Sequence, residues 1–252
     1  MKHRIKMEID NIYNMNCLDG MKHIGTASVD CIICDPPYLL ENQGGGFWSI
    51  AEEGNHYNAR GTRKGMDKLG DIKDGIGNDV LDEMCRVMKK INIYIFCSQK
   101  QIQQYLAYFV DGKGCNWNLI SWHKKNPIPA CGNKYLSDTE FILFFREKGV
   151  RLYGSYETKR TFYTTLRNQQ ENIEFGHPTV KPCQIIRNFV INSSQDGDIV
   201  LDPFMGSGTT AIACIKERRH FIGFELNKEY FDKAQRRIAL ERQQLSLDFG
   251  QR

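Results

Sequence analysis

Short apolar runs alternate with segments of helical periodicity along most of the chain. The runs are rich in branched and aromatic residues, which favour β-strands, and the segments between them repeat their apolar residues every three or four positions. This alternation is typical of a mainly parallel sheet covered by helices on both faces, a Rossmann-like α/β fold. Seven strands are predicted, at about residues 11–16, 29–34, 92–97, 117–123, 140–146, 198–202 and 220–225.

The helical segments between these strands carry apolar stripes that should face the sheet. Ser98 and Gln101 form a capping-box pattern at the start of one helix, and Pro182 suits the first turn of another. The stripes consist of Leu81, Met84, Cys85 and Met88, then Ile102, Tyr105, Leu106 and Phe109, then Ile185, Ile186, Phe189 and Val190, and finally Phe231, Ala234 and Ile238.

Two long segments, residues 39–77 and 151–176, interrupt this alternation. The first is rich in glycine and charged residues, and neither has a convincing helical period. Loops of this length in a compact domain usually have a function of their own. We therefore expect a single domain, residues 1–252, with two loop insertions.

Composition narrows the class of protein. Hydrophobic residues make up 41% of the 252 residues, which is enough for a sizeable core. No charged leader precedes an apolar segment, and no apolar run reaches the roughly 20 residues that span a bilayer, so we expect a soluble, cytoplasmic protein with no membrane partner. The 9 cysteines are odd in number and lie mostly in apolar segments, which indicates reduced thiols. Cys31 and Cys34 form a CxxC pair, but strand alternation points them to opposite faces, and no metal site is expected.

The stretch Asp35-Pro36-Pro37-Tyr38 comes directly after the apolar run that ends at Cys34. Two prolines carry no backbone N–H, so they end the strand and stiffen the turn beyond it. An aspartate carboxylate and a rigidly held proline carbonyl are both acceptors, and together they can accept the two hydrogens of a planar amino group. Tyr38 can stack on the attached ring. The motif suits an exocyclic amine on an aromatic base.

A second motif, a glycine turn, comes after the strand that ends at Asp202. Its residues, Gly206-Ser207-Gly208-Thr209-Thr210-Ala211, fit the loose dinucleotide pattern G-x-G-x-x-A, and the next strand leads to Glu225, which could bind ribose hydroxyls. A nucleoside-containing cofactor is indicated. In an open α/β sheet, ligands bind at the carboxyl ends of the strands where the strand order reverses, so the two motifs are predicted to face one crevice.

Together, Asp35-Pro36-Pro37-Tyr38 and the later Phe204-Met205-Gly206-Ser207-Gly208 resemble the amino-group DNA methyltransferases that use S-adenosylmethionine. The catalytic motif precedes the cofactor motif, as in the beta group of that family, whose motif order is circularly permuted. The segments Trp122–Pro129, Glu140–Leu143 and His177–Pro182 also look like family segments. The resemblance covers most of the chain and implies the class I methyltransferase fold.

The resemblance also assigns residues to roles. Asp35, Pro36, Pro37 and Tyr38 would be catalytic, with Asp35 and the Pro36 carbonyl orienting the amino group of a flipped base and Tyr38 stacking on it. Thr179 and Lys181 would close over the methionine end of the cofactor. Asp19 would contact its adenine ring, although a helix-capping role explains this residue equally well. The remaining cofactor-binding residues would be Asp202, Pro203, Phe204, Gly206, Ser207, Gly208, Thr209 and Glu225.

Contacts with double-stranded DNA are expected from the irregular regions, although the net charge of +4 is only mildly basic and ordinary solvated faces would explain the basic clusters equally well. No separate block for sequence recognition is evident. The two insertions would therefore serve DNA contact or dimerisation, and a homodimer and a cognate restriction endonuclease are candidate partners. The candidate DNA-binding residues are Phe47, Trp48, Arg60, Arg63, Lys64, Lys124, Lys125 and Asn126.

The aspartate form of the catalytic motif favours adenine as the target, with the amino group of cytosine as the alternative. A nicotinamide-dependent dehydrogenase would explain the glycine turn and Glu225 but not Asp35-Pro36-Pro37-Tyr38. An RNA or protein-glutamine methyltransferase would suit the same chemistry, although those relatives usually place the cofactor motif first. A noncatalytic nucleic-acid-binding module is a further alternative.

Overall fold

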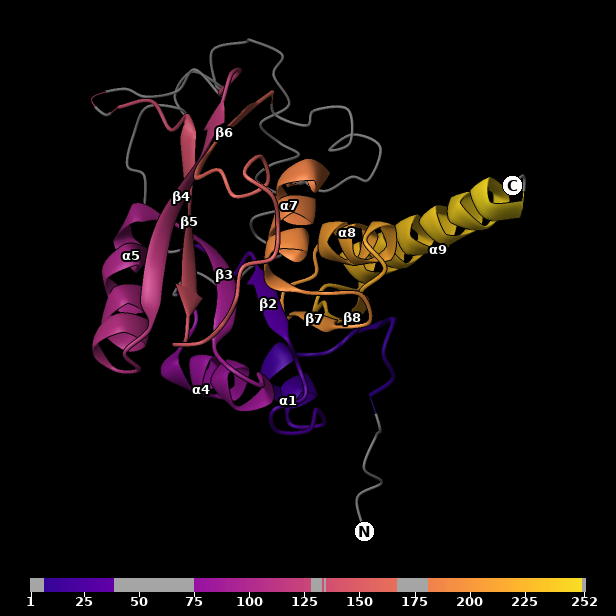
Figure 1. Ribbon diagram of the computed structural model, residues 1–252, viewed down its shortest axis with the longest axis horizontal. Coiled ribbons are helices and arrows are strands. Elements are labelled where there is room, and N and C mark those ends of the chain that lie inside the picture. The colour runs from indigo at the N-terminus through magenta and orange to yellow at the C-terminus, as the bar shows by residue number, and fades with distance from the viewer. Residues whose placement is uncertain (1–6, 39–74, 128–132, 134, 167–180, 251–252) are drawn as a thin grey trace, which may run out of the picture.

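A single eight-stranded sheet forms the centre of the molecule (Figure 1). The computed structural model describes residues 7–38, 75–127, 133, 135–166 and 181–250. The strands are β1 (Asn11–Tyr13), β2 (Cys31–Cys34), β3 (Asn92–Cys97), β4 (Asn116–Lys124), β5 (Thr139–Arg146), β6 (Phe162–Thr165), β7 (Ile199–Asp202) and β8 (His220–Phe224). Their spatial order is β1-β8-β7-β2-β3-β5-β4-β6, and only the β3–β5 and β4–β5 pairs are antiparallel.

All seven predicted strands are present, but the predicted number of strands is wrong, because β6 lies within the segment 151–176 that the sequence indicated as irregular. This strand has four residues, and its Phe162 side chain is exposed. It pairs along the end of β4, from Ser121 opposite Phe162 to Lys124 opposite Thr165. A short edge strand with an exposed aromatic residue has no apolar run that would identify it in the sequence.

Helices cover both faces of the sheet, as predicted. The first face carries α7 (Cys183–Ser193), α8 (Thr209–Lys216) and α9 (Lys228–Gly250), and the opposite face carries α1 (Cys17–Met21), α4 (Asn78–Val87), α5 (Gln99–Leu106) and the π-helical turn η1 (Ala107–Asp111). Figure 1 shows α7 and α8 on the other side of the sheet from α4 and α5. Among the described helices, none is long and apolar enough to cross a membrane.

The predicted apolar stripes supply the two cores. Leu81 and Met84 of α4 pack in one core, and Ile185 and Phe189 of α7 pack in the other. The cap of α5 also agrees with the sequence pattern, since Gln101 Oε1 accepts a hydrogen bond from the Ser98 backbone N–H at 3.0 Å. Apolar residues of the predicted stripes therefore face the sheet from both sides.

The central strand β2 is buried on both faces, which explains its continuous apolar sequence. Cys31 and Ile33 belong to the core under α7 and α8, whereas Ile32 and Cys34 belong to the core over α4 and α5. The two thiols of the CxxC pair consequently lie in different cores, as strand alternation predicted. They cannot share one metal ion in this arrangement.

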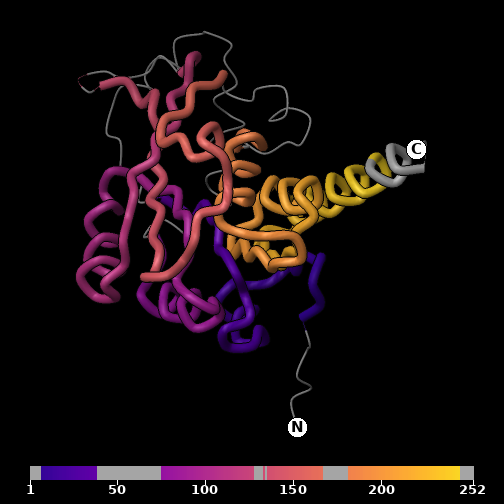
Figure 2. The backbone as a smooth tube through the Cα atoms, in the orientation of Figure 1, coloured from indigo at the N-terminus to yellow at the C-terminus, as the bar shows by residue number. Residues whose placement is uncertain are grey.

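The strand order reverses between β2 and β7. These strands are parallel neighbours, with Cys31 opposite Val200 and Ile32 opposite Leu201. After β2 the chain reaches α4 on one face, and after β7 it enters α8 on the other face. In Figure 2, the indigo segment that contains β2 lies beside the orange segment that contains β7. The carboxyl ends of β2 and β7 therefore form the topological switch point, where ligands of such sheets bind.

Candidate active site

Asp35 comes directly after β2, and Pro36 and Pro37 come next, without backbone N–H groups. Pro36 is buried, and the Pro37 carbonyl accepts a hydrogen bond from Gln101 Nε2 of α5 at 3.1 Å. Tyr38 packs against the core that contains α7. The motif is thus a rigid turn, fastened to α5 on one face of the sheet and to the core on the other. The Pro37 carbonyl thus serves to hold the turn, and Pro36, directly after Asp35, carries the carbonyl closest in sequence to that carboxylate.

The two oxygens of the Asp35 carboxylate have different surroundings. Oδ2 lies 2.8 Å from Lys181 Nζ. Oδ1 is buried, although the side chain as a whole is 26% exposed, and no group of the described residues donates a hydrogen bond to it. Burial raises the pKa of Asp35, and the Lys181 ammonium offsets this only in part. A buried acceptor without a donor is costly, so an N–H group of a ligand would be stabilised at Oδ1.

Lys181 joins Asp35 to Glu140 and Lys124, and these four residues are named the charge cluster. Lys181 Nζ lies 3.0 Å from Glu140 Oε2, and Lys124 Nζ lies 2.6 Å from Glu140 Oε1. Tyr38 Oη donates to Glu140 Oε2 at 3.3 Å and lies 3.4 Å from Lys181 Nζ. The cluster contains two residues of each sign and is balanced when all four are ionised.

Burial and ion pairing shift the pKa values of Glu140 and Lys181 in opposite directions. Burial alone would raise the pKa of Glu140, but the ammonium groups of Lys181 and Lys124 outweigh it and hold the pKa at about 2. Burial alone would lower the pKa of Lys181, but Asp35 and Glu140 outweigh it and raise the pKa. Glu140 is therefore a carboxylate and Lys181 an ammonium at neutral pH.

The glycine turn begins where β7 ends, at Asp202. Asp202 Oδ1 accepts from the Phe204 backbone N–H at 3.0 Å, and Oδ2 accepts from the Thr210 hydroxyl at 2.6 Å. Gly206 and Gly208 have φ angles of 52° and 83°, which favour glycine, and Gly208 caps α8. One buried carboxyl thus ties the start of the turn to the first turn of the helix. Burial raises the pKa of Asp202 to about 7, although both hydrogen bonds lower it.

Glu225, directly after β8, braces the same turn. Its Oε2 accepts from the Gly206 backbone N–H at 2.9 Å, and its Oε1 accepts from the Asn227 backbone N–H at 2.7 Å. Burial raises the pKa of Glu225. Within the part of the chain that the structure describes, no lysine or arginine pairs with Asp202 or Glu225. One buried and one partly buried carboxyl group without a cationic partner in the described chain favour a positively charged ligand beside this turn.

The two motifs lie at the same end of the sheet, on the neighbouring strands β2 and β7. Asp35 is near enough to Asp202 that its charge, after burial, helps to raise the pKa of Asp202. The predicted juxtaposition is confirmed. A group bound at the free Asp35 oxygen and a ligand bound at the glycine turn would be neighbours.

The sequence did not single out three residues of this site. Glu140, which lies in a family segment but had no role predicted for it, is the second residue of the largely apolar β5 (Thr139–Arg146). An acidic residue in such a place is a signal of a buried partner. Thr210 stands beside the predicted Thr209, and the structure gives it the hydrogen bond to Asp202. Arg237 of α9 donates from Nη1 to the Ser207 carbonyl at 3.1 Å and to Thr209 Oγ1 at 3.0 Å. Arg237 is buried on the face of α9 that packs against the core, and no motif in the sequence connects it with the glycine turn.

Lys181 and Asp19 make contacts in the structure that the resemblance did not indicate. Lys181 contacts the catalytic carboxylate, whereas the resemblance assigns it to the methionine end of the cofactor. Asp19 lies in the first turn of α1, is 67% exposed and pairs with Lys22 at 3.0 Å. The chain shortly before Asp19 reaches the glycine-turn side of the sheet, where the Asn14 side chain donates to the Glu225 carbonyl at 2.9 Å. The cofactor roles of both residues stay predictions.

The candidate DNA-binding residues fall into two groups. Lys124 belongs to the charge cluster, while Lys125 and Asn126 come after the end of β4, and the Lys125 side chain is exposed. The others lie outside the described residues, together with the cofactor candidate Thr179: they are Phe47, Trp48, Arg60, Arg63 and Lys64.

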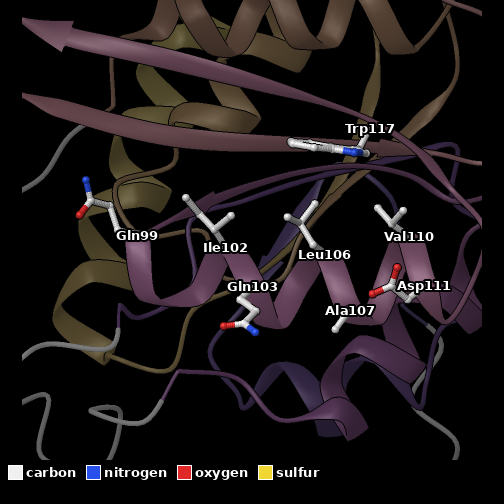
Figure 3. Close-up of a pocket in the computed structure, with 8 residues that line it drawn as sticks. All are labelled: Gln99, Ile102, Gln103, Leu106, Ala107, Val110, Asp111 and Trp117. Atoms are coloured by element: carbon white, nitrogen blue, oxygen red, sulfur yellow. The ribbon is translucent and has the colours of Figure 1, made fainter.

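A separate groove runs along α5 and η1 beneath Trp117 of β4 (Figure 3). Ile102, Leu106 and Val110 point toward the Trp117 ring from the helical side. None of the residues that line the groove is a candidate site residue. The groove is therefore distinct from the site at the switch point.

Comparison with known proteins identifies the family. The model of a family described as DNA methylase, named for N6 and N4 methyltransferases, matches residues 29–236. The Type II methyltransferase M2.MboI of Moraxella bovis is 29% identical over 90% of this chain and 86% of its own length. M2.LlaDCHI of Lactococcus lactis subsp. cremoris is 30% identical over 86% of this chain and 85% of its own length.

Solved structures agree with this result. The structure of M1.HpyAVI in complex with SAM has a TM-score of 0.63 and 26% identity, and it matches over 90% of this chain and 98% of its own. The cytosine-N4-specific PvuII DNA methyltransferase, at 14% identity, has a TM-score of 0.64 over 89% of this chain and 84% of its own, which shows the fold alone.

These matches confirm the predicted class I methyltransferase fold, while circular permutation of the motif order stays a prediction. They give no support to a nicotinamide-dependent oxidoreductase. With a family model that spans most of its length, the chain belongs to the N6 and N4 DNA methylase family.

Proposed function

We propose that the protein transfers a methyl group from S-adenosylmethionine to the exocyclic amino nitrogen of a flipped adenine in double-stranded DNA. The observation that carries the proposal is the buried Asp35 Oδ1, which lacks a donor among the described residues and lies at the switch point beside the glycine turn. Membership of the DNA methylase family supports it.

The residues around the glycine turn fit the cofactor. Asp202 is buried and Glu225 is partly buried, and both carboxyl groups have raised pKa values and no cation beside them in the described chain. A cationic ligand would relieve this cost, and S-adenosylmethionine carries a sulfonium and an ammonium group. When bound, it supplies an electrophilic methyl group. Asp202, Pro203, Phe204, Gly206, Ser207, Gly208, Thr209 and Glu225 would hold it, with Asp19, Thr179 and Lys181 as further candidates.

The catalytic motif would prepare the amino nitrogen. The lone pair of an aromatic amine is delocalised into its ring, so the amine is a poor nucleophile. Asp35 Oδ1 and the Pro36 carbonyl would each accept one amino hydrogen and turn the lone pair toward the methyl group. Tyr38 would stack on the base, which must leave the duplex to reach the site. These tasks are orientation and hydrogen bonding, which a rigid Pro-Pro turn performs well.

The variant Asp35→Ala tests this assignment. Methyl transfer from labelled S-adenosylmethionine to DNA should be lost, because the acceptor is gone, while calorimetry should show cofactor binding close to that of the wild type. Glu157→Gln is a suitable control, since Glu157 is 69% exposed and pairs with Arg160 outside the site. Turnover by Asp35→Ala at the wild-type rate would contradict the role of Asp35.

The choice of adenine rests on the aspartate in the catalytic motif. The amino group of cytosine presents the same two hydrogens to the same acceptors, so geometry alone favours neither base. Digestion of modified DNA to nucleosides separates the outcomes. N6-methyl-2′-deoxyadenosine would support the proposal. N4-methyl-2′-deoxycytidine would show that the target is cytosine and would leave the role of Asp35 intact.

DNA would approach the carboxyl end of the sheet, where Lys125 and Asn126 come after β4. A phosphate contact by Lys125 would make binding less salt-dependent in Lys125→Gln, by about one unit in the slope of log K against log salt concentration. A homodimer and a cognate restriction endonuclease are proposed as partners, and the cytoplasm is proposed as the location, in keeping with the relatives named as Type II methyltransferases.

A further inference from the structure

The charge cluster is assembled on the face of the sheet that α7 covers. Glu140 of β5 lies opposite Trp122 of β4, and Lys124 is two residues further along β4, so their side chains share that face. Asp35 continues the alternation of Cys31 and Ile33, which belong to the core under α7. Lys181 lies two residues before α7. Four side chains from four segments of the chain thus meet at one point.

The ion pairs of the charge cluster form a chain, in which each pair limits the positions that the next side chain can take. The Lys181 ammonium has three donors, and two carboxylates on different strands lie 2.8 and 3.0 Å from it. Lys124 lies 2.6 Å from the other oxygen of Glu140, so the Glu140 carboxylate is held at both oxygens. Lys181 and Glu140 are only 8% and 13% exposed, which limits screening by solvent. With Glu140 neutral, Asp35 would be the only carboxylate left beside Lys181 among the described residues, and the remaining polar contact would be the Tyr38 hydroxyl at 3.4 Å.

We infer that Glu140 is a positioning residue for the reaction: it holds the Lys181 ammonium on Oδ2 of Asp35, so that Oδ1 stays directed toward the amino group. Lys124 serves the same purpose one step further from the substrate by fixing Glu140. The inference rests on the proposed function, because it assigns the free Oδ1 to the amino group. None of these three side chains needs to touch the base.

The two charges beside Asp35 act on it in opposite directions. Lys181 lowers the pKa of Asp35 and Glu140 raises it, both after the larger effect of burial, which raises it. Tyr38, Cys97 and Asp202 are further titratable groups near Asp35, and both variants leave them unchanged. Ionised Asp35 is the form that accepts an amino hydrogen, so a displacement of the acid limb between the variants and the wild type reports its ionisation. Glu140→Gln should move that limb to lower pH and Lys181→Met should move it to higher pH, each by about one pH unit.

The experiment measures single-turnover methyl transfer against pH for the wild type, Glu140→Gln and Lys181→Met, with Glu157→Gln as the control. Glu140→Gln should also lower the rate at the plateau roughly tenfold, while the dissociation constant of S-adenosylmethionine stays within about twofold of the wild type. Opposite displacements of the acid limb would support the inference. A loss of rate at every pH with the limb unmoved would overturn it, because that is the result of a merely structural role.

A conservative variant covers the case in which Glu140→Gln does not fold. Glu140→Asp keeps the charge but is one methylene shorter, so it should keep the wild-type acid limb and lower the plateau rate. A plateau rate equal to that of the wild type would overturn the positioning role. Wild-type protein that methylates no DNA would overturn the proposed function and this inference together, whereas an active wild type with an unmoved limb in both charge variants overturns only the inference.

Discussion

Replacing Asp202 by asparagine should make the free energy of unfolding less dependent on pH. The Asp202 side chain is buried, and its pKa rises from 3.8 to about 7 in the folded protein, chiefly because burial disfavours the charged form. Asparagine has nearly the same shape and keeps both contacts. Its Oδ1 can accept from the Phe204 N–H, and its Nδ2 can donate to the Thr210 hydroxyl once that hydroxyl rotates. The two proteins then differ mainly in one ionisable group.

The sign of the effect is set by proton binding. Below the unfolded pKa, Asp202 is protonated in both states and causes no penalty. As pH rises from about 4 to about 7, the unfolded chain loses this proton while the folded protein keeps it, so the wild type loses stability relative to the variant. A shift of about three pKa units corresponds to about 4 kcal/mol at 1.36 kcal/mol per unit. The free energy of unfolding of Asp202→Asn minus that of the wild type should grow by up to this amount and then stay level.

Urea unfolding at intervals from about pH 4.5 to pH 8.5 measures this difference, provided that both proteins unfold in two states. Asp196→Asn is a matched control, because the Asp196 side chain is 70% exposed and its contact with Arg219 is screened by solvent. The control should show a much smaller change with pH. A difference between Asp202→Asn and the wild type that stays flat over the whole range would refute the reasoning from burial.

Two further variants examine the glycine turn. Gly208→Ala should lower the free energy of unfolding, measured in urea, by about 1–2 kcal/mol. Alanine is strained at a φ of 83°, and its Cβ would lie 3.3 Å from the Cβ of Ala234. Unchanged stability would show that the turn adapts. Arg237→Leu should lower the free energy of unfolding by about 2 kcal/mol and weaken S-adenosylmethionine binding severalfold in calorimetry, because the carbonyl of Ser207 loses a charged donor. Full cofactor affinity in Arg237→Leu would show that the turn keeps its shape without this contact.

The sequence predicted most of the sheet because seven strands are apolar enough to be recognised. A strand that is buried on both faces needs a continuous apolar run, such as Cys31–Cys34 in β2. The ends of these runs also indicate where the loops of the site begin. The juxtaposition of Asp35 and Asp202 was also predictable, because parallel strands place their carboxyl ends at one edge. These predictions needed only local patterns and one rule of topology.

Contacts between side chains from distant segments could not be predicted from the sequence. Lys124 Nζ lies 2.6 Å from Glu140, which no spacing rule connects to it, and its predicted contact with DNA stays a prediction. The carboxylate nearest to Lys181 is Asp35, a pairing that the sequence did not indicate, and its predicted cofactor role also stays a prediction. Such pairs depend on the register between β4 and β5 and on the position of α7. The spacing of apolar residues along the sequence gives neither of these. β6 was missed for a related reason. Its residues, Phe162–Thr165, favour β-structure, but the run is only four residues long, and its pairing with β4 is what fixes it as a strand.

The neighbouring strands β2 and β7 also constrain when the protein can become active. Residue 32 pairs with residue 201, so most of the polypeptide must leave the ribosome before the two halves of the site can meet. A nascent chain that has completed only β2, β3 and α4 lacks Gln101, Glu140 and Lys181, which hold the catalytic turn and Asp35, and it has no partner strand on the other side. Synthesis that stops before β7 should therefore leave an inert fragment, because the glycine turn has not been made.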